Sequence, residues 1–185
     1  MSFHVRPAER SDVPRIIQLI KDLAEYEKEP DSAKATEELV IISQQLSDPG
    51  HVVLILIQLI RNIFEKHHAS ALVACLGTPE SPGETIGLAL YFFNFSTWTG
   101  KPGLYLEDLY VSPEHRNLGV GKALFGHLGK IAEENDCARL DWAVLKWNAP
   151  SIAFYEQVLG AKPMDEWQGM RLEIEGIQNL RKYVK

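Results

Sequence analysis

The residues most suited to chemistry form the loop Arg116–Gly121, an R-x-x-G-x-G sequence that opens a predicted helix. The first turn of a helix presents backbone N–H groups with no partner inside the helix, and the macrodipole places partial positive charge there. Glycine lets a bulky anion approach the backbone and tolerates positive φ. Arg116 and Lys122 add formal charge. Two glycines alone are weak evidence, but with their flanking elements they predict a cradle for a pyrophosphate.

Two predicted elements flank this loop. Residues Leu104–Val111 alternate along the chain and include the β-branched and aromatic types that suit a strand. Ser112-Pro113 ends that strand. After Gly119, apolar residues recur at helical spacing and predict one buried helix face. The loop is therefore expected between a strand and the N-terminus of an amphipathic helix.

The rest of the chain alternates between helix-like and strand-like patterns. The apolar run 52–60 is too short to cross a bilayer, which needs about 20 residues, so a buried strand or helix is favoured over a membrane or partner surface. The order of elements predicts a mixed sheet with helices on its faces. Helices are predicted at 11–26, from Thr36 and at 148–158, strands at 3–6, 69–76, 85–93, 138–145 and 170–174, and a loop at 94–103.

Composition argues against several classes of protein. The 185 residues, 45% hydrophobic and 24% charged, suit one soluble domain. A net charge of −6 with no basic run argues against nucleic acid as a partner. Cys75 and Cys137 form no C-x-x-C pair, so no disulfide framework, zinc cluster or other metal site is expected. No signal peptide is evident, and a cytoplasmic protein without membrane association is expected.

Several motifs resemble those of the GNAT N-acetyltransferases. The strand Tyr105–Val111 followed by Arg116–Gly121 is similar to that family's acetyl-CoA-binding motif, and Asn148–Tyr155 followed by Gly160-Ala161 resembles its second motif. Three further segments resemble the diamine acetyltransferase subfamily, which includes the spermidine/spermine and thialysine-type enzymes. These segments are 16–27, 91–101 and 147–148.

The resemblance implies a GNAT fold in a single domain spanning residues 1–185. This α+β fold has a central mixed, mostly antiparallel sheet of six to seven strands flanked by helices, and its splayed strands form the acetyl-CoA slot. The family also implies a homodimer. The segment Val40–Ile63 falls outside the similarity and is predicted to be an insertion, either a real elaboration or the product of mis-splicing.

The resemblance assigns acetyl-CoA contacts to three groups of residues. The loop would hold the pyrophosphate through backbone N–H groups, the end of the strand would pair with the pantetheine arm, and the second motif would line the other side. Tyr155 would face the thioester sulfur. The three groups are Arg116, Asn117, Leu118, Gly119, Val120, Gly121 and Lys122; Leu109, Tyr110 and Val111; and Asn148, Ala149, Pro150 and Ser151.

The implied reaction is direct attack by a neutral amine on the acetyl thioester. An alkylammonium with a pKa of about 10.4 is only about 1 part in 2,500 neutral at pH 7, so the site must remove a proton. Glu107 is the candidate base, directly or through a water molecule. The alternative is that Glu107 and Asp108 only attract the ammonium group. Asp108 is expected on the opposite face from Glu107, because side chains alternate along a strand.

Two further catalytic roles are predicted. Tyr155 is the candidate general acid for the departing thiolate, and the alternative is a tyrosine whose ring packs in the core. A backbone N–H of Leu109 or a neighbour could polarise the acetyl carbonyl.

The amine pocket is the part of the site where the sequence departs from its family. Ser96-Thr97-Trp98 stands where polyamine-specific members carry Asp-Pro-Trp, and Gln168-Gly169-Met170 stands where they carry Glu-Gly-Trp. The loss of two acids favours a shorter amine. Trp98 could add cation–π attraction, whereas Trp142 could equally belong to the core. Residues expected to line the pocket are Tyr26, Glu27, Trp98, Glu107, Asp141, Trp142 and Ala143.

The sequence thus predicts an acetyl-CoA-dependent N-acetyltransferase for a small aliphatic amine, such as a polyamine, a diamine or a thialysine- or lysine-like amino acid. Two alternatives remain open. One is a protein lysine or N-terminal acetyltransferase of the same fold, and the other is a non-catalytic acetyl-CoA sensor.

Overall fold

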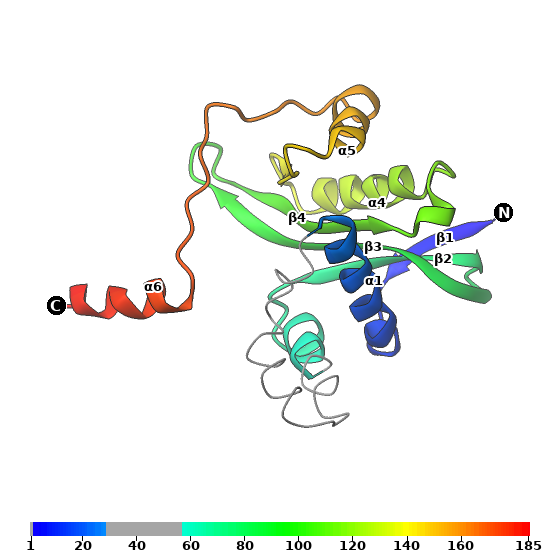
Figure 1. The fold of residues 1–185 in the computed structure, drawn as a ribbon, viewed down its shortest axis with the longest axis horizontal. Coiled ribbons are helices and arrows are strands. Elements are labelled where there is room, and N and C mark those ends of the chain that lie inside the picture. The colour runs from blue at the N-terminus through cyan, green and yellow to red at the C-terminus, as the bar shows by residue number, and fades with distance from the viewer. Residues whose placement is uncertain (1, 29–56) are drawn as a thin grey trace. The chain divides into compact units, whose positions relative to one another are not determined.

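The computed structural model describes residues 2–28 and 57–185. These form two compact units that divide between Ala143 and Val144. The first unit contains a five-stranded sheet in the order β1-β2-β3-β4-β5 (Figure 1). Its strands are antiparallel to their neighbours except for the parallel pair β4–β5. The strands are β1 (Phe3–Pro7), β2 (Ser70–Thr78), β3 (Ser81–Ser96), β4 (Lys101–Val111) and β5 (Leu140–Trp142).

The α+β class and the mixed, mostly antiparallel sheet are confirmed, but the described residues form a sheet of five strands rather than six to seven. The predicted strand at 170–174 is wrong: Met170 and Leu172 are exposed, and a short helix, α6 (Ile174–Asn179), begins there. A lone strand is unstable without a paired neighbour, and the unit from Val144 to Lys185 contains no second strand. The predicted loop at 94–103 is also too long, because β3 and β4 extend to a turn at 97–100.

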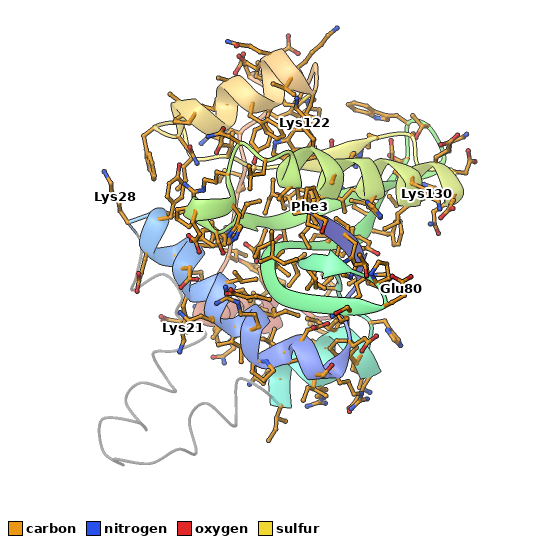
Figure 2. All side chains as sticks on the ribbon, turned by 90° about the vertical axis from the view of Figure 1, so that its right-hand side faces the viewer. Phe3, Lys21, Lys28, Glu80, Lys122 and Lys130 are labelled. Carbon is orange, nitrogen blue, oxygen red and sulfur yellow. The ribbon has the colours of Figure 1, made fainter. Side chains whose placement is uncertain are left out.

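Two helices cover opposite faces of the sheet. α1 (Val13–Tyr26) buries Ile16 and Leu19 against Leu88 and Tyr110, which pair across β3 and β4. On the other face lies α4 (Val120–Glu134), whose Val120 contacts the position of a Cβ at Gly87. Figure 2 labels Lys21 on α1 and Lys130 on α4, with the sheet between the two helices. The buried apolar face predicted for each of these two helices is confirmed.

Short helical turns complete the described chain. They include η1 (Arg10–Asp12), η3 (Ile60–Glu65) and η4 (Pro113–His115) in the first unit. The second unit contains α5 (Ala149–Ala153), η5 (Phe154–Val158), α6 and η6 (Leu180–Tyr183). The helix predicted from Thr36 and most of the predicted insertion Val40–Ile63 lie outside the described residues. Within residues 2–28 and 57–185, no helix has the length and apolar character needed to cross a membrane.

An ion pair fixes the start of α1 to the sheet. The Arg6 guanidinium donates to both carboxylate oxygens of Asp12, at 2.6 and 2.9 Å, and the backbone N–H of Glu9 donates to the same carboxylate at 2.7 Å. Burial acts to raise the pKa of Asp12, but these hydrogen bonds outweigh it and hold the pKa below its ordinary value. Strand β1 and helix α1 are therefore joined by a charge-assisted, two-pronged contact.

Candidate active site

The glycine loop has the geometry of an anion cradle. Gly119 is the N-cap of α4 and adopts φ 88°, a left-handed conformation that favours glycine. The backbone N–H of Ala123 bonds to the Gly119 carbonyl at 2.9 Å, so the N–H groups of the preceding first turn have no acceptor in the helix. A Cβ at Gly119 would meet no atom within 4 Å, which leaves the space beside this turn open. Asn117 also has positive φ, at 62°.

The side chains around this loop divide between packing and exposure. Val120 is 1% exposed and packs against the sheet, so it can offer a ligand only its backbone. Leu118 is 50% exposed, and Lys122 is exposed on the first turn of α4, as Figure 2 shows. The loop thus presents backbone N–H groups together with one exposed cationic side chain.

Strand β4 carries a β-bulge at Glu107. Leu90 of β3 pairs with Asp108, whereas the next residue, Tyr91, pairs with Leu106, so Glu107 is the extra residue on β4. A bulge interrupts the alternation of side chains and bends the strand. Bulges are frequent beside active sites, where they redirect a side chain.

Asp108 lies on the face that α1 covers, with Glu107 beside it in the bulge. Tyr110 packs with α1, and Asp108 lies two residues away on the same face. Leu106, paired with Tyr91, belongs to the opposite face, and Glu107 is the extra residue between Leu106 and Asp108. The expectation that Glu107 and Asp108 lie on opposite faces assumed unbroken alternation, which the bulge interrupts. Two adjacent acids in an otherwise apolar strand were the signal that could have indicated the bulge.

Asp108 is the most strongly perturbed acid of this face. Burial raises its pKa to about 6, and the negative charges of Glu107 and Glu27 add to that effect. Glu107 is exposed, whereas Asp108 is partly buried. Glu27 directly follows the last residue of α1. Three carboxylates from two elements therefore act on one another, and together they form an acidic site suited to a cation.

Beyond the bulge, β4 pairs with a neighbour on one side only among the described residues of its own unit. Pairing with β5 covers Leu104–Leu106 against Leu140–Trp142 and stops where the bulge begins. Pairing with β3 continues to Val111. The backbone of 107–111, which includes the predicted pantetheine contacts Leu109, Tyr110 and Val111, thus follows an open edge of β4. The pairing with β5 stops because β5 ends at Trp142, so the splaying of the strands stays a prediction.

Arg116 lies on the α1 side of the loop. Its Nε donates to the carbonyl oxygen of Val111 at 3.0 Å, and its Cζ lies 4.6 Å from the ring centroid of Tyr26 and 5.6 Å from that of Tyr110. The sequence pattern assigned Arg116 to the cofactor as a source of charge, and that role stays a prediction. Its contact with two tyrosine rings was not predicted, since nothing in the local sequence places α1 beside the loop.

The other residues predicted for the amine pocket are dispersed within the first unit. Tyr26 and Glu27 lie at the end of α1, on the acidic face. Asp141 is held by Arg139 at 2.8 Å and lies 3.4 Å from the Asn94 amide nitrogen.

Trp142 and Trp98 differ in their surroundings. The ring of Trp142 packs edge-on against Phe125 of α4 at 5.1 Å, which agrees with a core role, and Ala143 follows it. Trp98 is 83% exposed in the turn between β3 and β4. The distance along β4 from that turn to Glu107 is about 20 Å. The structure therefore does not bring Trp98 to the acidic site within this unit.

The second unit contains the remaining predicted residues. The Asn148 side chain accepts a hydrogen bond from the Ser151 backbone at 3.3 Å, and Pro150 lies in the first turn, so the predicted helix start is confirmed. The helix continues as the π-helical turn η5, in which the Tyr155 ring contacts Phe154 at 5.6 Å between centroids. π-helical turns occur frequently at functional sites. Gly160 follows the segment with φ 72°, a left-handed conformation that favours glycine.

A family model described as the acetyltransferase (GNAT) family matches residues 21–161. The chain belongs to this family. It is therefore an N-acetyltransferase, as the sequence motifs predicted. The glycine loop, the bulged β4 and the capped α5 all lie within the matched residues.

Similar proteins support the same assignment. A thialysine N-epsilon-acetyltransferase from Bos taurus is 32% identical, over 95% of each chain. A human spermidine/spermine N(1)-acetyltransferase-like protein 1 is 31% identical, over 92% of this chain and 22% of its own length. Among solved structures, an integron cassette protein from V. cholerae has a TM-score of 0.68 with 24% identity, covering 98% of this chain and 99% of that one. The last likeness shows the fold alone.

Asp108 provides a test of the acidic site that does not depend on activity. Its folded-state pKa of about 6 exceeds the ordinary value of 3.8, so the folded protein binds this proton more tightly than the unfolded chain does. Ionisation of Asp108 therefore destabilises the fold. We expect Asp108→Asn to increase the free energy of unfolding. The increase should be complete above pH 6 and absent below about pH 4. Urea denaturation at pH 4, 6 and 8 measures this difference.

Asp136→Asn is the matched control, because Asp136 is exposed and pairs with Lys101 at the surface. That substitution should change the stability by less than about 1 kcal/mol. A stability gain at Asp108 that was the same at all three pH values would contradict an ionisation penalty.

Proposed function

We propose that this protein transfers the acetyl group of acetyl-CoA to a primary amine of a small aliphatic amine. The observation that carries this proposal is the acidic face at the β4 bulge, which adjoins an open strand edge and leads into the N-terminus of α4. The relatives named for thialysine and for spermidine/spermine support an aliphatic amine as acceptor. On the family resemblance alone, we further propose that the chain acts as a homodimer in the cytoplasm.

The cofactor side of the proposal rests on backbone groups. The first-turn N–H groups of α4 and the exposed Lys122 would hold the pyrophosphate. The open edge at 107–111 would pair with the amide groups of the pantetheine arm, as an added strand would pair with a sheet edge. A backbone N–H of Leu109 or a neighbour would then polarise the acetyl carbonyl. Acetyl-CoA supplies the activated acetyl group.

The proton of the incoming ammonium would pass to the acidic face. Glu107 is exposed and can reach the amine directly or through a water molecule, whereas Asp108 is partly buried behind it. We propose Glu107 as the accessible acceptor, with Asp108 and Glu27 supplying the charge that attracts the ammonium.

Tyr155 would serve the leaving group. A phenol near the sulfur could donate a proton or a hydrogen bond to the departing thiolate. The cap at Asn148 and the first turn to Ser151 would line the same side of the cofactor. Both assignments rest on the family resemblance.

The nature of the acceptor follows from charge and size. Three carboxylates favour a cation, but Ser96 gives the β3–β4 turn a hydroxyl that accepts from the Thr99 N–H at 3.4 Å instead of a carboxylate. The polyamine-specific pattern is thus incomplete, and a thialysine- or lysine-like amino acid or a short diamine fits better than a long polyamine.

A thiol-release assay over a panel of amines tests the proposal. The panel contains thialysine, lysine, ornithine, short diamines, spermidine, and peptides with a free lysine or a free N-terminus. We expect the highest kcat/KM for a small amine. Turnover of the peptides alone would favour a protein acetyltransferase, and tight acetyl-CoA binding with no turnover would favour a sensor.

Gly119→Asp tests the anion cradle. The new carboxylate would face the pyrophosphate, while the left-handed backbone tolerates aspartate better than most residues. Repulsion between these charges should weaken acetyl-CoA binding about tenfold or more, as measured by calorimetry. Gly126→Asp is the matched control: it lies on the exposed face of the same helix, and a Cβ there also meets no atom within 4 Å. Equal affinity in the two variants would contradict the cradle.

Glu107→Gln separates a base from an electrostatic anchor. If Glu107 accepts the proton, kcat should fall about 10²–10⁴-fold. If Glu107 acts only through its charge, kcat should change little. In either case the pKa of Asp108 should fall, because one of the charges that raise it is gone, so the size of the fall in kcat is the readout that separates the two roles. Glu134→Gln, at the exposed end of α4, is the control and should leave kcat and the pKa of Asp108 unchanged.

A further inference from the structure

Arg116 joins three elements of the first unit through one side chain. Its Nε–H bonds to the Val111 carbonyl at the end of β4, and its guanidinium stacks on Tyr110 of β4 and on Tyr26, the last residue of α1. Tyr26 packs against the hydrophobic core, and Tyr110 is 6% exposed. The two rings and the carbonyl therefore define the position of the guanidinium from three directions.

The charges around Tyr110 show the electrostatic character of this contact. Burial raises the pKa of Tyr110, and the nearby carboxylates of Asp22 and Glu114 act in the same direction. The Arg116 charge, together with a hydrogen bond from it, acts in the opposite direction. Asp22 lies on α1 and Glu114 on η4. The Arg116 cation is therefore close to a carboxylate of each of these two elements and to the end of β4.

The contact with Tyr26 matters for the acidic face because Glu27 is the next residue of the chain. The charge of Glu27 is among the causes that raise the pKa of Asp108. The described part of the chain stops at residue 28, shortly after the end of α1, and resumes at residue 57. A contact that holds Tyr26 against β4 therefore also holds Glu27 beside Asp108.

We propose that Arg116 is a positioning residue for the amine: it holds the end of α1, and with it Glu27, against the acidic face of β4. This inference rests on the proposed function, and it differs from a role for Arg116 as a ligand of the cofactor pyrophosphate. The side chain points toward Tyr26, Tyr110 and Val111, whereas the loop offers its backbone N–H groups at Gly119 and beyond.

Four variants test the inference by separating stacking, charge and the tyrosine hydroxyl. Arg116→Gln removes both the charge and the stacked guanidinium. Arg116→Lys keeps the charge but loses the planar group and the Nε donor. Tyr26→Leu removes the ring, and Tyr26→Phe keeps the ring without its hydroxyl. Arg10→Gln is the matched control, because Arg10 is an exposed arginine of the same unit paired with Glu65.

The decisive readout is KM for the amine compared with the calorimetric Kd of acetyl-CoA. We expect Arg116→Gln to raise the amine KM about 2- to 30-fold, the range that a cation–π contact supports, with the acetyl-CoA Kd changed less than about twofold. Arg116→Lys should restore only part of the loss. Tyr26→Leu should match Arg116→Gln, and the double variant Tyr26→Leu with Arg116→Gln should add nothing further. Tyr26→Phe keeps the ring that contacts the guanidinium, so it should leave amide exchange at residues 23–27 at the wild-type rate.

Three results would overturn the inference. A weakened acetyl-CoA Kd with an unchanged amine KM would make Arg116 a cofactor ligand. Full rescue by lysine would show that charge alone matters. Additive effects of Arg116→Gln and Tyr26→Leu would show that the two residues act independently.

Amide hydrogen exchange keeps this test separate from the proposed function. If Arg116 holds the end of α1, Arg116→Gln should accelerate exchange at residues 23–27, whereas Arg10→Gln should not. Unchanged exchange there would overturn the inference even if the wild type acetylates amines. If exchange accelerated as expected but the wild type acetylated no amine, the proposed function would be wrong. The role of Arg116 in positioning the amine would then be wrong as well, whereas its contact with the end of α1 would stand.

Discussion

The single extra residue at Glu107 is the constraint on which the site depends. It lies where the pairing of β4 with β5 stops, it places two acids beside each other in the bulge, and among the described residues the next stretch of β4 pairs only with β3. A regular strand of the same sequence would place Asp108 on the opposite face from Glu107. In the proposed reaction, substrate charge, cofactor access and proton transfer would thus all depend on one irregularity in a hydrogen-bonded ladder.

The two ends of α1 are fixed by different physics. At its start, Asp12 accepts two hydrogen bonds from Arg6 in a partly buried ion pair, which is directional and charge-assisted. At its end, Tyr26 lies beneath the Arg116 guanidinium, a softer contact between a cation and a ring. The start of the helix is therefore set by the sheet, whereas the end is set by a residue of the glycine loop. A change in the loop can reach the acidic face without crossing the core.

The sequence was a good guide to local structure and a poorer guide to pairing. The helix start at Gly119, the cap at Asn148 and the apolar face of α1 follow from spacing and from residue type, so all three were predictable. The bulge was not, because it depends on the register of β3 against β4, which involves residues far apart in the chain. The prediction of a strand at 170–174 was wrong for a related reason. Alternating side chains indicate a strand, but they do not supply the second strand with which it must pair. Trp98 could be assigned to a pocket by resemblance, but only the length of the β3–β4 hairpin fixes its distance from Glu107.

The open edge of β4 has a consequence for the protein when it carries no ligand. A strand with unpaired backbone groups can template the addition of a strand from another chain, and proteins discourage this with bulges and charged side chains. Glu107 and Asp108 supply both at the point where the paired edge ends. The same two residues that suit the site to a cation thus also make this edge a poor template for the strand of another chain, so the acidic site and protection against aggregation depend on one sequence feature.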